Sequence, residues 1–340
     1  MAVMTRTRPR IFGTLPGSVD VPGDYLAAVA EIAAWCEDGG CTGVLIYTDN
    51  SLVDPWLIAQ ELIGRTTTLS PLVALQPVYM HPYAAAKLVS TLADLYGRRV
   101  YLNMVAGGFV NDLVSLGDSE VHDRRYDRLV EFATIVQRLV ADEGPVDYEG
   151  HWYQVKNLRL QPPVPEDLRP GYLVSGSSPA GLQAARALGA TAVQYPKPAG
   201  EYAAADDGDV VDKGIRIGLI ARADADEAWR TAWERFPGDQ RGRLMHRLAM
   251  ATSDSMWHRQ LSRLGQAATS DRPTYWLHPF ENYKTFCPYL VGTYDEVADT
   301  VARYLDLGFT TFILDIPHEA SDLSHAQVVF EKAVARVQTP

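Results

Sequence analysis

Short continuous runs of apolar residues recur along this chain of 340 residues, and most are followed by stretches in which apolar residues return every three or four positions. The runs are typical of parallel strands covered on both faces, and the periodic stretches are typical of amphipathic helices. The expected strands are residues 10–15, 43–47, 68–75, 100–105, 172–174, 192–195, 215–221 and 311–315. The expected helices are residues 25–36, 55–63, 82–95, 122–140, 179–188, 226–236, 294–307 and 323–337.

Eight strands that are each tied to a helix predict an α/β fold of the (β/α)8 TIM-barrel type. A doubly wound open sheet is the alternative, but eight units over this length favour a closed barrel. No internal repeat, low-complexity tract or linker divides the chain, so residues 1–340 are expected to form a single domain.

Two stretches depart from this alternation. Residues 149–161 alternate like a β-hairpin, which we expect to decorate the rim of the barrel. Residues 238–290 form the longest insertion, which lacks a barrel strand and precedes the last helix–strand pair. Loops of this length often cover active sites, so this insertion is expected to act as a lid, with a merely decorative excursion as the alternative.

Charge and composition narrow the class of protein. A formal net charge of −11 speaks against nucleic acid or an anionic membrane as a partner. No apolar run has the length of a signal peptide core or a membrane span, and three cysteines give no paired framework, as expected of a soluble cytoplasmic protein. The histidines lack metal-ligand spacing, so no metal site is expected, and no hydrolase elbow, P-loop or dinucleotide fingerprint is present.

The turn after the fifth expected strand has the composition of a phosphate-binding cup. Gly176 allows the bend, and Ser177 or Ser178 would cap a helix that begins at Pro179. Hydroxyls, free N–H groups and the positive end of the helix dipole would then point at one spot, which suits a phosphate. A turn that caps itself and binds nothing is the alternative.

Three motifs in the order and positions expected of a barrel resemble the luciferase-like flavin-dependent monooxygenases. They are Tyr-Leu-Asn-Met-Val-Ala-Gly-Gly at 101–108, His-Asp-Arg-Arg-Tyr at 122–126 and Leu-Val-Ser-Gly-Ser-Ser at 173–178. Weaker matches extend the similarity over nearly the whole chain, and the alkanesulfonate monooxygenases look closest. The fold of that family is a TIM-type barrel, in agreement with the strand count.

The resemblance implies a bound flavin, FMN, with named contacts. It implies that Asn103 contacts the flavin ring and that His122 and Tyr126, which share a helix face, reach towards its ribityl-phosphate end. Gly176, Ser177 and Ser178 would form the other wall of the phosphate site. From the residues alone, Asn103 could equally satisfy loop backbone, His122 could face solvent and Tyr126 could be a core aromatic.

The resemblance also implies the chemistry. In this family reduced FMN comes from a separate flavin reductase, reacts with O2 to give a C4a-peroxide and transfers one oxygen atom to an organic substrate, in a site that excludes water. An F420-dependent oxidoreductase of the same superfamily and a flavin-binding barrel without oxygenase activity are the alternatives. The members are usually dimers or tetramers, so a homo-oligomer is expected.

Three positions depart from the alkanesulfonate enzymes. Leu52, Gly218 and Ile316 stand where those enzymes have a cysteine, a histidine and a tyrosine, whereas Arg216 is retained. A sulfonate needs cationic and hydrogen-bonding groups to offset its desolvation. The three replacements therefore predict a roomier and more apolar substrate pocket, for a bulkier compound such as an intermediate of specialised metabolism. Arg216 is a candidate catalytic residue that binds substrate or assists deprotonation, with a salt bridge inside the barrel as the alternative.

Overall fold

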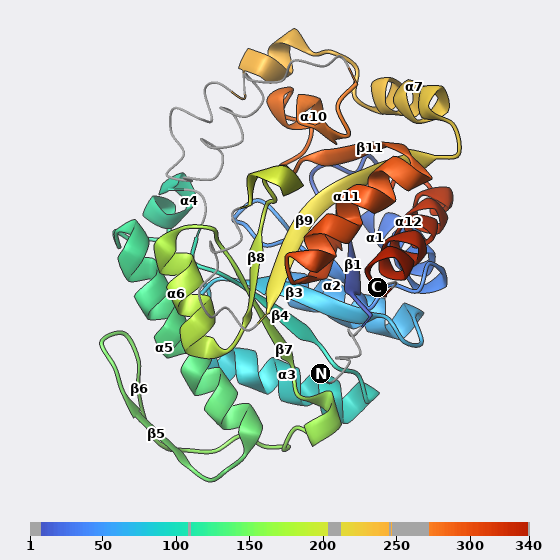
Figure 1. The fold of residues 1–340 in the computed structure, drawn as a ribbon. Coiled ribbons are helices and arrows are strands. Elements are labelled where there is room, and N and C mark those ends of the chain that lie inside the picture. Colours follow the sequence, from blue (N-terminus) through green and yellow to red (C-terminus); the bar gives the residue numbers. More distant parts are fainter. Residues whose placement is uncertain (1–7, 108–109, 203–211, 245, 247–271, 339–340) are drawn as a thin grey trace, which may run out of the picture.

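Eight parallel strands close into a barrel in the computed structural model, which describes residues 8–107, 110–202, 212–244, 246 and 272–338 (Figure 1). Each strand pairs with the next in parallel, β8 pairs with β9, and β12 closes the ring onto β1. The predicted (β/α)8 fold is therefore confirmed, and the open sheet is excluded. The barrel strands are β1 (Arg10–Thr14), β2 (Gly43–Ile46), β3 (Ser70–Leu75), β4 (Tyr101–Val105), β7 (Gly171–Ser175), β8 (Thr191–Gln194), β9 (Lys213–Arg222) and β12 (Phe309–Leu314).

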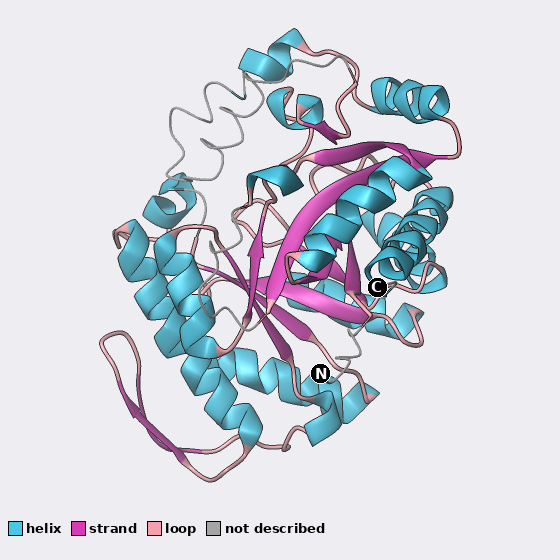
Figure 2. Ribbon diagram, in the orientation of Figure 1, coloured by secondary structure: helices cyan, strands magenta, loops and turns pink. Residues whose placement is uncertain are grey.

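Helices surround the barrel as an outer layer (Figure 2). All eight predicted helices are present, and several begin where a capping side chain accepts a backbone hydrogen bond, such as Asp24, Asp54 and Thr293. They are α1 (Tyr25–Asp38), α2 (Pro55–Arg65), α3 (Pro82–Tyr96), α5 (His122–Ala141), α6 (Pro179–Leu188), α7 (Ala225–Arg235), α11 (Tyr294–Asp306) and α12 (Ala320–Gln338). The short helices α4 (Val110–Ser115) and α10 (His278–Glu281) were not predicted. No described helix is both long and apolar enough to cross a membrane.

The barrel interior is a packed core. Phe12 and Tyr101 meet edge to face with ring centroids 5.0 Å apart, and a side chain at Gly171 would collide with the Tyr101 ring. Leucine, valine and isoleucine from neighbouring strands fill the remaining space. Because these side chains fill the inside of the barrel, we expect a ligand to bind at the carboxyl ends of the strands, where TIM barrels carry their active sites.

The predicted hairpin is present and lies beside α5. Its strands are β5 (Val146–Glu149) and β6 (Gln154–Leu158), so it begins slightly earlier than expected. The carboxylate of Glu131 on α5 accepts the backbone N–H groups of His151 and Trp152 in the turn. The Tyr153 hydroxyl then donates to the carbonyl of Pro77, in the loop after β3. The turn thus reaches the carboxyl end of the barrel, while the strands run beside the helix.

Strand β9 is shared between two sheets. Its first half pairs with β8 and β12 in the barrel, and residues 218–222 pair in parallel with β11 (Tyr289–Thr293). Strand β11 in turn pairs antiparallel with β10 (Tyr275–Trp276). The predicted insertion at 238–290 therefore contains β10 and the first residues of β11, which the sequence pattern did not reveal.

Much of this insertion, residues 245 and 247–271, lies outside the described residues, so the lid remains a prediction. The connection between β8 and β9 is described only in part. It contains one 3-10 turn, Ala199–Glu201, and residues 203–211 lie outside the described range.

Candidate active site

Asn103 and Ser175 meet at the carboxyl ends of β4 and β7. The Ser175 hydroxyl donates to Oδ1 of Asn103 over 2.7 Å, and the asparagine is only 5 % exposed. This bond fixes the orientation of the Asn103 amide. Its Nδ2 group meets no acceptor in the described part of the chain, so it remains available as a donor to a ligand.

The turn between β7 and α6 forms the predicted cup. Ser178, not Ser177, is the N-cap, and its Oγ accepts the N–H of Gly181 over 3.1 Å. The turn therefore caps its own helix through this one hydrogen bond, as the alternative interpretation expected. The backbone N–H groups of Ser177, Ser178 and Ala180 donate to no acceptor among the described residues. Three amide donors at a helix N-terminus are thus free for an anion.

Tyr126 closes one side of this cup. Its side chain is 8 % exposed, and its hydroxyl lies 3.5 Å from the carbonyl oxygen of Ser175. A Cβ on Gly176 would lie 2.2 Å from the Tyr126 hydroxyl oxygen, so only glycine permits this contact. Burial raises the pKa of the Tyr126 phenol, while the Ser178 hydroxyl lowers it. The phenol therefore stays protonated at neutral pH and can act as a hydrogen-bond donor.

His122 stands beside Tyr126 on α5. The two rings meet edge to face at 5.3 Å, and Nδ1 of His122 lies 2.7 Å from a carboxylate oxygen of Asp123. The structure thus brings together His122, Tyr126, Gly176 and Ser178, with Ser177 in the same turn. Asn103 joins this group through Ser175.

A second polar cluster surrounds Arg216 on β9. Its Nη2 lies 3.2 Å from Oδ1 of Asp315 and donates to the Tyr47 hydroxyl, while the guanidinium lies over the Tyr47 ring. The other carboxylate oxygen of Asp315 accepts from Thr285 over 2.5 Å and from Tyr289 over 2.9 Å. Arg216 and Asp315 are both nearly buried. The salt bridge considered as the alternative for Arg216 is therefore what the structure shows.

Gly218 does not open the pocket as expected. A Cβ at this position would lie 2.3 to 2.4 Å from atoms of the Tyr289 ring. The space that glycine leaves is thus filled by a phenol from β11, and the expectation of extra room here was wrong. Burial and the nearby Asp315 carboxylate raise the pKa of both the Tyr289 phenol and the Cys287 thiol, which keeps both groups neutral.

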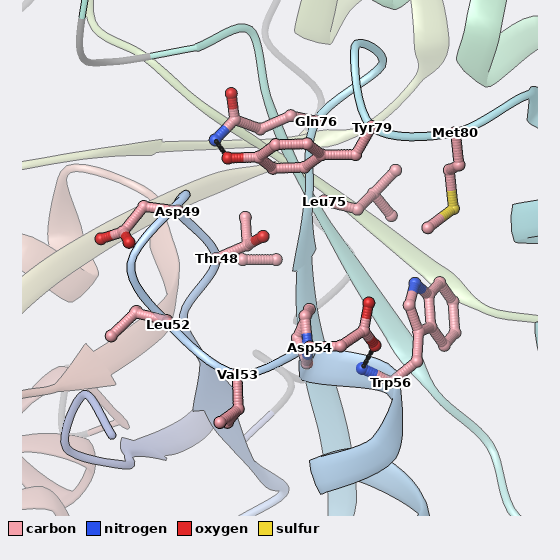
Figure 3. A pocket seen from close by; sticks show the side chains of 12 residues that line it. Thr48, Asp49, Leu52, Val53, Asp54, Trp56, Leu75, Gln76, Tyr79 and Met80 are labelled. Carbon is pink, nitrogen blue, oxygen red and sulfur yellow. Dashed lines mark hydrogen bonds between the residues drawn. The ribbon is translucent and has the colours of Figure 1, made fainter. Parts of the chain in front are cut away.

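A cavity of about 290 Å³ opens between the loops after β2 and β3 (Figure 3). Leu52 lies in its wall, whereas Gly218 and Ile316 are not among its lining residues. Ile316 packs instead at the edge of the main core. Asn103 is not one of the lining residues, but it lies on the next strand, where it is the register partner of Ala74 in the cavity wall. The lining residues are Thr48, Asp49, Leu52, Val53, Asp54, Pro55, Trp56, Ala74, Leu75, Gln76, Tyr79 and Met80.

Two aromatic side chains of the lining carry polar groups. The Tyr79 hydroxyl donates to Asn50 over 2.8 Å, and burial with nearby Asp112 and Asp49 raises its pKa to about 12. The indole N–H of Trp56 is buried and has no acceptor in the described part of the chain. The cavity walls thus mix apolar side chains with polar ones, and the Trp56 N–H is unpaired but not exposed to the cavity, which suits a small organic molecule with both apolar and polar parts.

Asp315, Thr285 and Tyr289 were missed by sequence reasoning. The aspartate carried a usable signal, because an acid at the carboxyl end of a barrel strand lies at the face where active sites are built. The other two lie in the insertion and gave no signal.

Comparisons with known proteins agree with this geometry. The sequence profile of the luciferase-like monooxygenase family matches residues 2–311. The 4-(gamma-L-glutamylamino)butanoyl-[BtrI acyl-carrier protein] monooxygenase BtrO of Niallia circulans is 31 % identical over 327 residues, which cover 94 % of this chain and 96 % of BtrO.

Solved structures with the same fold have different cofactors in their descriptions. A riboflavin lyase, RcaE, with modified FMN and riboflavin matches with a TM-score of 0.72 and 17 % identity, over 97 % of this chain and 92 % of its own. An F420-dependent secondary alcohol dehydrogenase matches with a TM-score of 0.62 and 16 % identity, over 98 % of this chain and 100 % of its own. These matches support the barrel fold and leave the choice of cofactor open.

Proposed function

Because the chain belongs to the luciferase-like monooxygenase family, we propose that it is a two-component enzyme that uses reduced FMN and O2 to insert one oxygen atom into a small organic substrate. Membership makes it a flavin-dependent oxidoreductase of the monooxygenase kind. The use of FMN, the supply of reduced flavin by a separate reductase, assembly as a homo-oligomer and a cytoplasmic location belong to the proposal.

The cup beside Tyr126 is the observation that carries this proposal. Free N–H groups of Ser177, Ser178 and Ala180 would bind the phosphate of FMN, and the Tyr126 phenol would exchange its long hydrogen bond to the Ser175 carbonyl for one to the phosphate. Asn103 would hold the ring with its free Nδ2. When bound, reduced FMN supplies the electrons that activate O2.

The pocket next to Asn103 would receive the substrate. Leu52, Leu75 and Met80 give it one apolar wall, and the unpaired N–H of Trp56 would orient a carbonyl or other acceptor of the substrate once the ring moves towards the cavity. A volume of about 290 Å³ admits an acyl chain or a small ring, but no folded partner.

An alkanesulfonate does not fit the charge of the site. Asp315 neutralises Arg216, and the other oxygen of its carboxylate accepts hydrogen bonds from Thr285 and Tyr289. The cavity itself is lined by Asp49 and Asp54 and by no cationic residue of the described chain. A sulfonate would therefore be desolvated without a compensating cation.

The name of BtrO suggests which substrate to test first. That relative acts on an acyl group carried by an acyl-carrier protein. We propose an acyl thioester of this kind as the first candidate class for the present enzyme, presented at the end of a flexible arm so that only the acyl group enters the cavity.

An anaerobic titration tests the cofactor. The protein is mixed with FMN, dithionite-reduced FMN and reduced F420, binding is followed by absorbance and fluorescence, and O2 is then admitted. Tight binding of reduced FMN, followed by oxygenated product from an acyl thioester, is the expected result. Exclusive binding of reduced F420 would instead establish the F420-dependent alternative, and flavin binding without oxygenation of any candidate would favour a barrel without oxygenase activity.

A further inference from the structure

Arg125 is a buried cation that forms no ion pair with the residues that the structure describes. It lies on the first turn of α5 and is 4 % exposed. Its Nε is buried without an acceptor, and its side chain forms no ion pair or hydrogen bond with any residue in the described ranges. A guanidinium removed from water in this way is costly unless an anion compensates it.

Among the buried charged side chains nearby, positive charge is in excess, whereas the carboxylate of Asp123 on the same turn is exposed to solvent. Arg128 binds Asp118 through two hydrogen bonds of 2.6 and 3.2 Å, and both side chains are nearly buried. Arg125 is close enough to help lower the pKa of Asp118 but does not bond to it. Two guanidinium groups therefore share one carboxylate, and this group of three carries a net charge of about +1 at neutral pH.

The guanidinium of Arg125 lies near the wall of the phosphate cup that Tyr126 forms, since its charge helps to lower the pKa of the Tyr126 phenol. His122, Arg125 and Tyr126 occupy the same turn of α5, and residues three apart on a helix are neighbours on its surface. Tyr126 in turn touches Gly176 of the cup. The N-termini of α5 and α6 converge here, and each adds the positive end of a helix dipole.

From this arrangement we infer that Arg125 provides the positive charge that holds the phosphate of FMN. The inference rests on the proposed function and extends it, since it assigns the electrostatic part of cofactor binding to one residue on α5. Arg124, the preceding residue, differs from Arg125 in its exposure to solvent and in its contacts. It is half-exposed, and its guanidinium stacks over the ring of Trp152 4.5 Å away.

Comparing FMN with riboflavin tests the inference, because the two ligands differ only by the phosphate. Dissociation constants for both, in oxidised and reduced form, are measured by anaerobic fluorescence titration for the wild type, Arg125→Met, Arg125→Lys and the control Arg124→Met. Arg125→Met should weaken FMN binding by about 30-fold, as for a lost charged hydrogen bond, and riboflavin binding by less than 2-fold, about the scatter of a neutral change. Arg125→Lys should retain most of the preference for FMN, and Arg124→Met all of it.

Other outcomes separate the possible failures. If Arg125→Met weakens the binding of FMN and riboflavin equally, Arg125 has a structural role and the inference is wrong. If Arg125→Met does not fold, the wild type and Arg125→Lys are compared at low and high salt concentration. A preference for FMN over riboflavin that changes neither with salt nor with this substitution would refute the inference. If the wild type binds neither flavin, the proposed function itself fails.

Discussion

Replacing Gly176 by alanine tests whether the cup depends on close contact with Tyr126. The added Cβ would lie 2.2 Å from the phenol oxygen and 3.0 Å from Cζ, so the ring must move. The backbone itself tolerates alanine, since Gly176 is not among the glycines with positive φ. The expected loss is therefore the cost of overpacking, about 1–3 kcal/mol. If this appears in binding, the flavin dissociation constant should rise by about 5- to 150-fold.

A double-mutant cycle identifies the cause. Tyr126→Phe removes the oxygen that collides with the new methyl group, so part of the loss in Gly176→Ala should be recovered in the double variant. Gly200→Ala is the matched control, because nothing lies within 4 Å of a Cβ at that position. Affinity is measured by flavin fluorescence and stability by urea unfolding. Wild-type affinity in Gly176→Ala, or strictly additive losses in the cycle, would refute the described contact.

Three further predictions concern other parts of the molecule. Ser177→Ala removes the hydroxyl that the sequence places at the cup and should weaken FMN binding with little change in stability, whereas Ser178→Ala should also cost about 1 kcal/mol of stability because Ser178 caps α6; equal unfolding midpoints would contradict this. Asp315→Asn should strengthen binding of small anions such as sulfate by freeing the charge of Arg216, measured by calorimetry; unchanged affinity would show that Arg216 is inaccessible. Glu37→Gln should destabilise the protein by about 1–2 kcal/mol at pH 7, reduced by solvent exposure, because backbone N–H groups of residues 67–69 hold the pKa of Glu37 at about 2. Since this pKa is lowered on folding, the difference in urea unfolding should be full above pH 4.5 and vanish towards pH 2; a constant difference would contradict it.

The barrel could be predicted because its strands are buried on both faces. Continuous apolar runs such as residues 43–46 and 311–314 can form little else between amphipathic helices. Strand β11 escaped this reasoning. Its apolar run is short, is bordered by Pro288 and Gly292, and gains its meaning only from pairing with the second half of β9.

Only those parts of the candidate site whose residues lie close together in the sequence could be predicted from it. The cup lies within six consecutive residues, whereas the carboxylate of Asp315 meets Thr285 and Tyr289 across the insertion. The sequence also presents Arg124 and Arg125 side by side, and only the phase of α5 decides which one is buried. Such contacts depend on tertiary packing, which local spacing does not encode.

Strand β9 has a consequence for the exchange of parts between related barrels. Its residues up to Ile217 pair with β12 in the barrel, and its residues from Gly218 onwards pair with β11. An insertion cut out at residues 238 and 290 would carry Tyr289 away from the glycine that accommodates its ring. In a chimeric enzyme the two parent sequences should therefore be joined inside β9, and positions 218 and 289 must be exchanged together.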